Sequence, residues 1–121
     1  MAEIKTIDVG KEFFHRLANR DKKQGDGKYN AEEFRNKYLI QLDSPDKWKN
    51  NEEEVILDFQ NVKKLGPSFA NEAFAYFTKY AKPEQILKKI KIINISNGKL
   101  ELINVELESG YTPSWKAKLG I

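Results

Sequence analysis

The segment from Val55 to Phe74 constrains the fold of this chain more than any other stretch. It begins with a short apolar run, residues 55–59, which is interrupted only by Asp58. Such a run is typical of a strand in a sheet that is covered on both faces. After a loop, Gly66-Pro67-Ser68 begins a stretch with apolar residues at helical spacing. A central strand, a loop and a helix are therefore expected in this order.

The rest of the chain alternates strands with helices. Asn30 and Glu33 have the spacing of a helix-capping pair, and Gly110 follows the last apolar periodicity. Strands are expected over residues 4–9 and 90–95, and helices over residues 11–19, 30–39, 67–80, 83–87 and 99–107. This order predicts an α/β fold, a small mixed β-sheet packed against helices. Residues 1–110 would form one domain and residues 111–121 a C-terminal tail.

Composition fits a single globular domain. The chain has 121 residues, of which 40% are hydrophobic, and domains of about 100–150 residues are the commonest size. The absence of cysteine excludes disulfides and thiol catalysis. The N-terminal residues lack the apolar core of a signal peptide, and no apolar run is long enough to cross a membrane. A cytoplasmic location is the expectation.

Basic residues are in mild excess, with a net charge of +3 and a pI near 9.0. The lysines at 63–64, 88–89 and 91 are interrupted by acids and core positions, which favours solvated faces over a nucleic-acid surface. Trp48 and Trp115 are expected to be exposed. Together with the lysines, they keep a nucleic-acid-associated role open as an alternative.

One loop has the partial spacing of a calcium site. In residues 22–33, Asp26, Gly27 and Glu33 occupy the fifth, sixth and twelfth positions of an EF-hand loop. Lys22 and Gln24, however, stand where the first and third oxygen ligands belong, so a degenerate loop followed by a helix cap is favoured. His15 is the only histidine, and no metal or cofactor is expected.

Ser68 and Asp58 form the best candidate chemical site. Asp58 ends the central strand, where ligands bind in open α/β sheets, and Ser68 opens the following helix. From the residues alone, plain helix capping by Gly66 or Ser68 is the favoured interpretation. No histidine or lysine at a recognisable spacing would activate Ser68, and no glycine-rich phosphate loop is present, so an enzyme is not expected.

Two segments resemble the STAS-like domain family of unknown function. One is Leu57 to Val62 followed by Pro67 to Phe74. The other is Tyr29 to Arg35, which is similar to the family's Ser-Gly-Glu-x-Phe-Arg signature with Asn30-Ala31 in place of the small pair. The best-known STAS domains are anti-sigma-factor antagonists, in which a kinase phosphorylates a serine at the start of the helix after the central strand.

The resemblance implies a bacterial, non-enzymatic signalling regulator that acts by binding a protein. Ser68 would be the phosphoacceptor, although Gly66-Pro67-Ser68-Phe69 stands where STAS domains have an acid, a serine and a glycine. The implied partner is a histidine-kinase-like ATPase or an anti-sigma-type protein. The alternative is a nucleic-acid-associated, mobile-element or phage accessory protein that acts by binding. The partner-binding candidates are Asp58, at the end of the central strand, and four residues expected to be exposed on the Ser68 helix, Asn71, Glu72, Ala75 and Lys79.

Overall fold

A computed structural model describes residues 4–20 and 29–112. Strands alternate with helices along the chain, as the sequence predicts. The elements in chain order are β1 (Thr6–Asp8), α1 (Val9–Glu12), β2 (Arg16–Leu17), α2 (Ala31–Tyr38), η2 (Ile40–Leu42), η3 (Pro45–Trp48), β3 (Val55–Asp58), β4 (Lys64–Leu65), α3 (Pro67–Ala73), η4 (Ala75–Lys79), α4 (Pro83–Lys89), β5 (Ile90–Ile93) and α5 (Asn97–Ser109), where η denotes a 3₁₀ helix.

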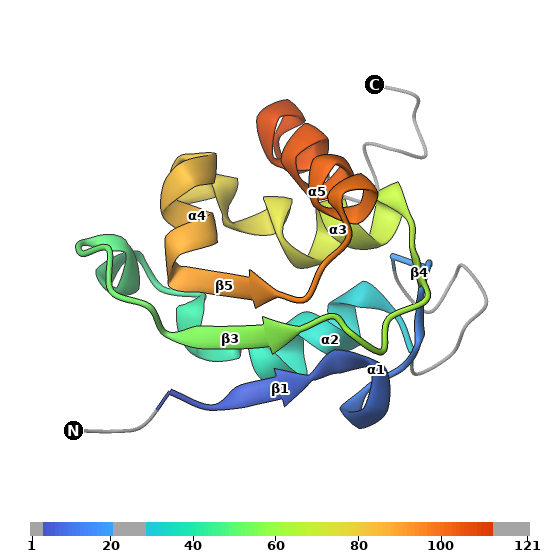
Figure 1. Cartoon of the computed structure of the whole chain (residues 1–121). Helices are drawn as coiled ribbons and strands as arrows, with labels where there is room; N and C mark the ends of the chain where they lie inside the picture. The colour runs from blue at the N-terminus through green and yellow to red at the C-terminus, as the bar shows by residue number, and fades with distance from the viewer. Residues whose placement is uncertain (1–3, 21–28, 113–121) are drawn as a thin grey trace.

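The main sheet is parallel and has β3 at its centre. Its strand order is β1-β3-β5, and Ile7, Leu57 and Ile92 lie side by side across it. In Figure 1 the three strands lie next to one another, with α2 behind them and α3, α4 and α5 along the upper side. β2 and β4 form a separate two-residue parallel ladder. The predicted α/β class and the central position of the 55–59 strand are confirmed.

The sheet buries only one of its faces. Val55 and Leu57 are 4% and 0% exposed, whereas the alternate residues Ile56 and Asp58 are half-buried. Lys91, which aligns with Ile56 across the sheet, is exposed. Successive side chains of a strand point to opposite faces, so the helices cover the Leu57 face and leave the other open. The expectation that both faces would be covered is wrong.

Side-chain caps explain where three of the helices begin. The Asn30 side chain accepts a hydrogen bond from the backbone N–H of Glu33 at 2.9 Å, which confirms the predicted capping pair. Asp8 caps α1 in the same way, and Ser96 caps α5. Gly110 ends α5 with φ of 83°, a conformation that glycine adopts without steric cost. Of these three side-chain caps, only that of Asn30 is predicted from the sequence, and the Asp8 and Ser96 caps begin their helices two residues before the predicted starts.

Two predicted helices differ from the observed ones. The helix expected over residues 11–19 is limited to α1, because residues 16–17 form β2 instead. The N–H of Gly66 bonds to the C=O of Leu17 at 2.7 Å, and the N–H of Lys63 bonds to that of His15 at 2.8 Å. The helix expected over residues 67–80 breaks at Phe74 into α3 and η4. For residues 16–17, backbone pairing with the distant residues 64–65 outweighs the helix that the spacing of apolar residues predicts.

Helix α3 lies at the centre of the helical layer and packs against both α2 and α5. The rings of Phe34 in α2 and Phe69 in α3 are 5.5 Å apart, and both side chains are fully buried. Trp48 is also buried, against the prediction. It packs 5.5 Å from the Phe77 ring and donates its indole N–H to the C=O of Leu42 at 2.8 Å. Trp115 lies outside the described residues.

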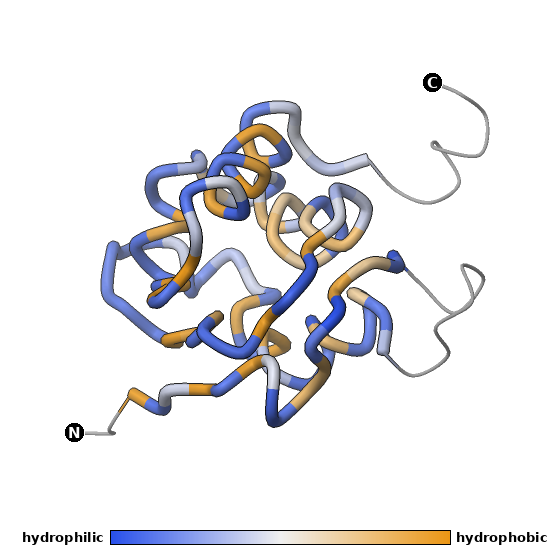
Figure 2. The backbone as a smooth tube through the Cα atoms, turned by 45° about the vertical axis from the view of Figure 1, so that its right-hand side comes forward, coloured by the Kyte–Doolittle hydropathy of each residue, from blue (hydrophilic) through white to orange (hydrophobic). Residues whose placement is uncertain are grey.

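Hydrophobic residues are spread over strands and helices rather than gathered in one run (Figure 2). Among the described residues, no helix is both long and apolar enough to span a bilayer.

Candidate functional site

Ser68 lies in the first turn of α3, but it is not the helix cap. Gly66 occupies the cap position and Pro67 the first helical position. The Ser68 side chain is half-buried and forms no hydrogen bond with any residue that the structure describes. Plain capping, which the residues alone favour, therefore does not account for the hydroxyl.

Asp58 lies at the carboxyl end of β3, on the open face of the sheet. Its carboxylate accepts hydrogen bonds from the backbone N–H of Gln60 at 2.9 Å and from the side-chain amide of Asn94 at 3.1 Å. Asp8 is its neighbour across the sheet and accepts from the Asn61 amide at 2.8 Å. The described contacts of Asp58 thus hold the loops that leave β3 and β5, and none of them reaches Ser68.

The predicted contact face on the Ser68 helix is wrong at three of its four positions. Asn71 and Glu72 are each 3% exposed, and Ala75 is fully buried; only Lys79 is exposed. The helix has its apolar residues on one face, but α5 and the chain after it cover the opposite face as well. Asn71, Glu72 and Ala75 therefore cannot meet a partner without rearrangement of the fold.

Glu72 is the centre of a buried ion cluster. Arg35 of α2 donates to the Glu72 carboxylate and also, at 2.8 Å, to its backbone C=O. Arg20 pairs with the other carboxylate oxygen at 3.2 Å, and the Tyr111 hydroxyl donates to the carboxylate at 2.9 Å. Burying a carboxylate is costly unless it is paired and hydrogen-bonded, and Glu72 meets both conditions.

Asn71 continues this cluster toward the end of the described chain. Its side-chain amide donates to Glu106 at 3.1 Å and to the C=O of Gly110 at 2.9 Å. Its oxygen accepts from the N–H of Thr112 at 2.9 Å and from Arg20. Tyr111 and Thr112 therefore belong to the folded domain rather than to the tail predicted from residue 111.

Burial raises the pKa of Tyr111 above its ordinary value, and the charge of Glu72 and the hydrogen bond to it raise the pKa further. The phenol therefore stays protonated and keeps its hydrogen-bond donor at neutral pH. The sequence interpretation missed the partners of Glu72. The available signal was that Arg35 and Glu72 have opposite charges and lie in the two resembling segments.

Lys79 is held by a second cluster, centred on Asp43. Its ammonium lies 3.8 Å from the Asp43 carboxylate and 3.6 Å from the centroid of the Tyr76 ring. Asp43 accepts hydrogen bonds from the hydroxyls of Tyr76 at 2.7 Å and Tyr80 at 2.6 Å. Lys79 remains open to solvent, but its charge already has an internal partner.

The pKa values of this cluster follow from those contacts. Burial alone would raise the pKa of Asp43, but hydrogen bonds from Tyr80 and Tyr76 and the charge of Lys79 together lower it. Burial, followed by the bond to Asp43, raises the pKa of Tyr76 to about 12. The bond to Asp43 is the larger cause for Tyr80, whose pKa is also about 12. At neutral pH the carboxylate is thus charged and both phenols are neutral.

Metal-binding side chains are not clustered in the part of the chain that the structure describes. No group of three or more His, Cys, Asp or Glu side chains lies close enough together, within residues 4–20 and 29–112, to hold a metal ion. Residues 21–28 of the calcium-like loop lie outside the described residues. His15 is exposed, and its ring contacts the Phe14 ring.

The model of a family described as a STAS-like domain of unknown function matches residues 30–100. The match includes α2, β3 and α3, and so both members of the Arg35–Glu72 pair. No curated protein and no solved structure is significantly similar to the chain.

Proposed function

Because the chain belongs to the STAS-like domain family of unknown function, we propose that it is a non-enzymatic regulator that works by partner switching. It binds a histidine-kinase-like ATPase or an anti-sigma-type protein, and phosphorylation of Ser68 changes that binding. Membership of this family accounts for the α/β fold. The class of partner and the phosphorylation of Ser68 are our proposal.

The main support for this proposal is that the Ser68 hydroxyl has no structural role among the described residues. It is half-exposed and bonds to no described residue, so modifying it breaks no contact of the fold. The next residue, Phe69, is fully buried and anchors the turn that presents the serine. A hydroxyl that is held in place and not used by the fold suits a modification site.

The proposed step is a phosphoryl transfer from ATP. The Ser68 oxygen forms a bond to the γ-phosphorus as the bond to the ADP oxygen breaks, and the hydroxyl proton passes to a base of the ATPase. The product carries about −1.5 to −2 charge at neutral pH, at a site that was neutral. Such a change alters affinity for a surface that was complementary to the free serine.

Of the predicted partner-binding residues, Asp58 and Lys79 are within reach of solvent, as is the candidate phosphoacceptor Ser68. Since Asn71, Glu72 and Ala75 are buried, the contact surface is centred on the Ser68 turn instead of on the whole length of its helix. Glu72→Lys is unsuitable as a binding test, because it would place a third cation between Arg20 and Arg35.

Calorimetric titration with a histidine-kinase-like ATPase, where one is encoded beside the gene, tests the proposal. Ser68→Asp should weaken binding about tenfold or more, which corresponds to 1.4 kcal/mol. Ser68→Ala should bind within about twofold of the unchanged chain, since a neutral small residue makes the same surface. Ser109→Asp, at an exposed serine that ends α5, is the matched control and should have no effect. Equal affinities for Ser68→Asp and Ser109→Asp would contradict the proposal.

A further inference from the structure

An open pocket of about 750 Å³ lies beyond the carboxyl ends of the parallel strands. Three chain segments line it, each following a different strand of the main sheet. Arg16 comes from the segment after β1, Lys63 and Lys64 from the segment after β3, and Lys99 from the start of α5, after β5. Open α/β sheets bind ligands at this end of their strands, and the volume is within the range of small-molecule sites.

The charged side chains that line the pocket are all positive. Four cationic side chains line it and no acidic one does, whereas the whole chain has a net charge of only +3. The rest of the chain therefore carries a net charge of −1. Arg16 and Lys64 are also direct neighbours in the β2–β4 ladder, so two of these positive residues lie side by side.

The three pocket lysines differ from four of the ten other lysines that the structure describes, because those four form ion pairs. Lys63, Lys64 and Lys99 have no acidic partner among the described residues. By contrast, Lys47, Lys49, Lys79 and Lys91 each lie within 4.0 Å of a carboxylate. The charges of these three lysines are thus available to a ligand.

The backbone at the start of α5 adds hydrogen-bond donors to these charges. Ser96 caps the helix by accepting from the N–H of Lys99 at 3.3 Å, and the dipole of this 13-residue helix is positive at that end. A side chain placed at Gly98 would meet no atom within 4 Å, so the backbone there is open to close approach by an oxyanion.

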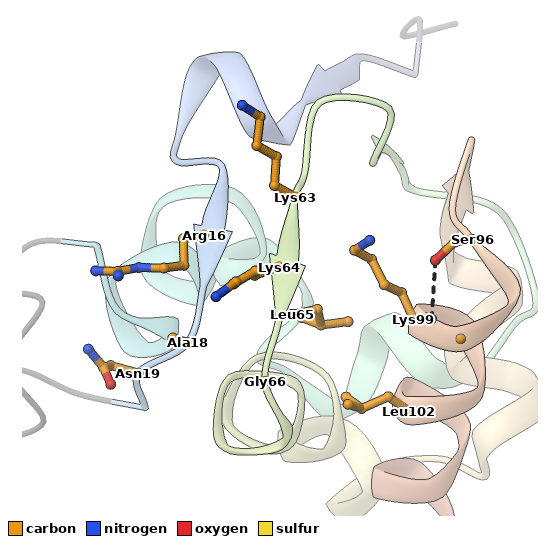
Figure 3. Close-up of a pocket in the computed structure, with 11 residues that line it drawn as sticks. Arg16, Ala18, Asn19, Lys63, Lys64, Leu65, Gly66, Ser96, Lys99 and Leu102 are labelled. Atoms are coloured by element: carbon orange, nitrogen blue, oxygen red, sulfur yellow. Dashed lines mark hydrogen bonds between the residues drawn. The ribbon is translucent and has the colours of Figure 1, made fainter.

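Leucine side chains give the pocket an apolar part. Leu65 of β4 and Leu102 of α5 are both half-buried and line it. Figure 3 shows these two side chains pointing toward one another, with Lys99 extending from α5 toward β4 above them. A ligand that fits this pocket would have an anionic group that contacts the cationic side chains and an apolar group that contacts the two leucines.

We propose that this pocket binds a small organic phosphate. The phosphate oxygens accept from the lysines and from the start of α5, and the carbon part of the ligand contacts Leu65 and Leu102. Charge-assisted hydrogen bonds to phosphate are short and strong, and the three lysines are the groups that supply them. This site is independent of the proposed modification of Ser68.

Calorimetry and amide NMR on the full chain test this proposal, with phenyl phosphate, inorganic phosphate and phenol as probes. Phenyl phosphate should bind more tightly than either of the other two, and its signal changes should cluster at residues 63–66 and 96–102. Lys99→Ala should weaken its binding roughly tenfold, the equivalent of one lost charged hydrogen bond. Lys88→Ala removes the same charge from an exposed position on α4 and should change affinity less than about twofold.

Three results would overturn the proposal. One is the absence of phenyl phosphate binding at concentrations up to about 10 mM, because a dissociation constant above that value is too weak for a specific site. The second is an equal loss in Lys88→Ala and Lys99→Ala, which would mean a general charge effect. The third is tight binding of a single-stranded oligonucleotide with no binding of phenyl phosphate, which would make the lysines a nucleic-acid surface. Circular dichroism of each variant checks that it is folded.

Discussion

Replacing Glu72 by glutamine tests whether the buried ion cluster holds the two family segments together. The Glu72 side chain is 4% exposed and accepts bonds from Arg20, Arg35 and Tyr111. Glutamine preserves its size but removes its charge, and it replaces one acceptor oxygen with an NH₂ donor. If that donor faces Arg35 and Tyr111, two bonds are lost and both arginines lose their counter-charge.

The magnitude follows from those losses. Both lost bonds are made to the charged carboxylate, and a hydrogen bond to a charged group contributes about 1.5–3 kcal/mol. Their sum agrees with the roughly 3–5 kcal/mol that breaking a buried ion pair costs. For a domain of this size, the melting temperature should fall by roughly 10–20 °C.

Urea unfolding at pH 7, followed by the fluorescence of the buried Trp48, measures the change. Glu53→Gln is the matched control, because Glu53 pairs with Lys91 at 3.7 Å with side chains 32% and 56% exposed. Exposed pairs contribute less than about 1 kcal/mol. Combining Glu72→Gln with Arg35→Met should cost less than the sum of the single changes. A cost for Glu72→Gln no larger than that of Glu53→Gln would refute the structural role of the cluster.

Two further changes test the packing and the electrostatics of the fold. Gly10→Ala should destabilise the fold strongly, because the new carbon would lie 2.1 Å from the backbone oxygen of Asn61. Gly98→Ala meets no atom within 4 Å and should stabilise the fold by about 0.4–1 kcal/mol, and the same urea unfolding measures both changes. Asp43 has a pKa lowered below 3.8 by folding, so its contribution to stability is present above that pH and is lost as pH falls through the folded pKa. Below pH 3.8 the free energy of unfolding should therefore fall more steeply with decreasing pH in the unchanged chain than in Asp43→Asn. Equal slopes would contradict the stabilising role of the Asp43 carboxylate.

The parts of the fold that local chemistry determines could be predicted from the sequence. The Asn30 cap, the central strand at 55–59 and the last helix depend on residues a few positions apart, and the structure confirms them. β2 could not be predicted, because its pairing with β4 joins residues 48 positions apart. The sequence pattern of residues 11–19 favours a helix, and only tertiary contact changes it.

The candidate site was harder to predict for the same reason. Glu72 and Asn71 occupy polar positions on an amphipathic helix, and such positions are usually exposed. They are buried because Arg35 and Arg20, 37 and 52 positions away from Glu72, supply compensating charge. The cationic pocket likewise gathers its residues from three separate segments, so no single stretch of sequence reveals it.

The most direct test of the proposed regulation is the intact mass of the protein isolated from its own cells, followed by mapping of any modified residue. The proposal predicts that a fraction of the protein carries one phosphate group, that the phosphate lies on Ser68, and that it is absent from Ser68→Ala. An unmodified Ser68 in both growing and starved cells, while the chain still binds its ATPase partner, would contradict control by phosphorylation.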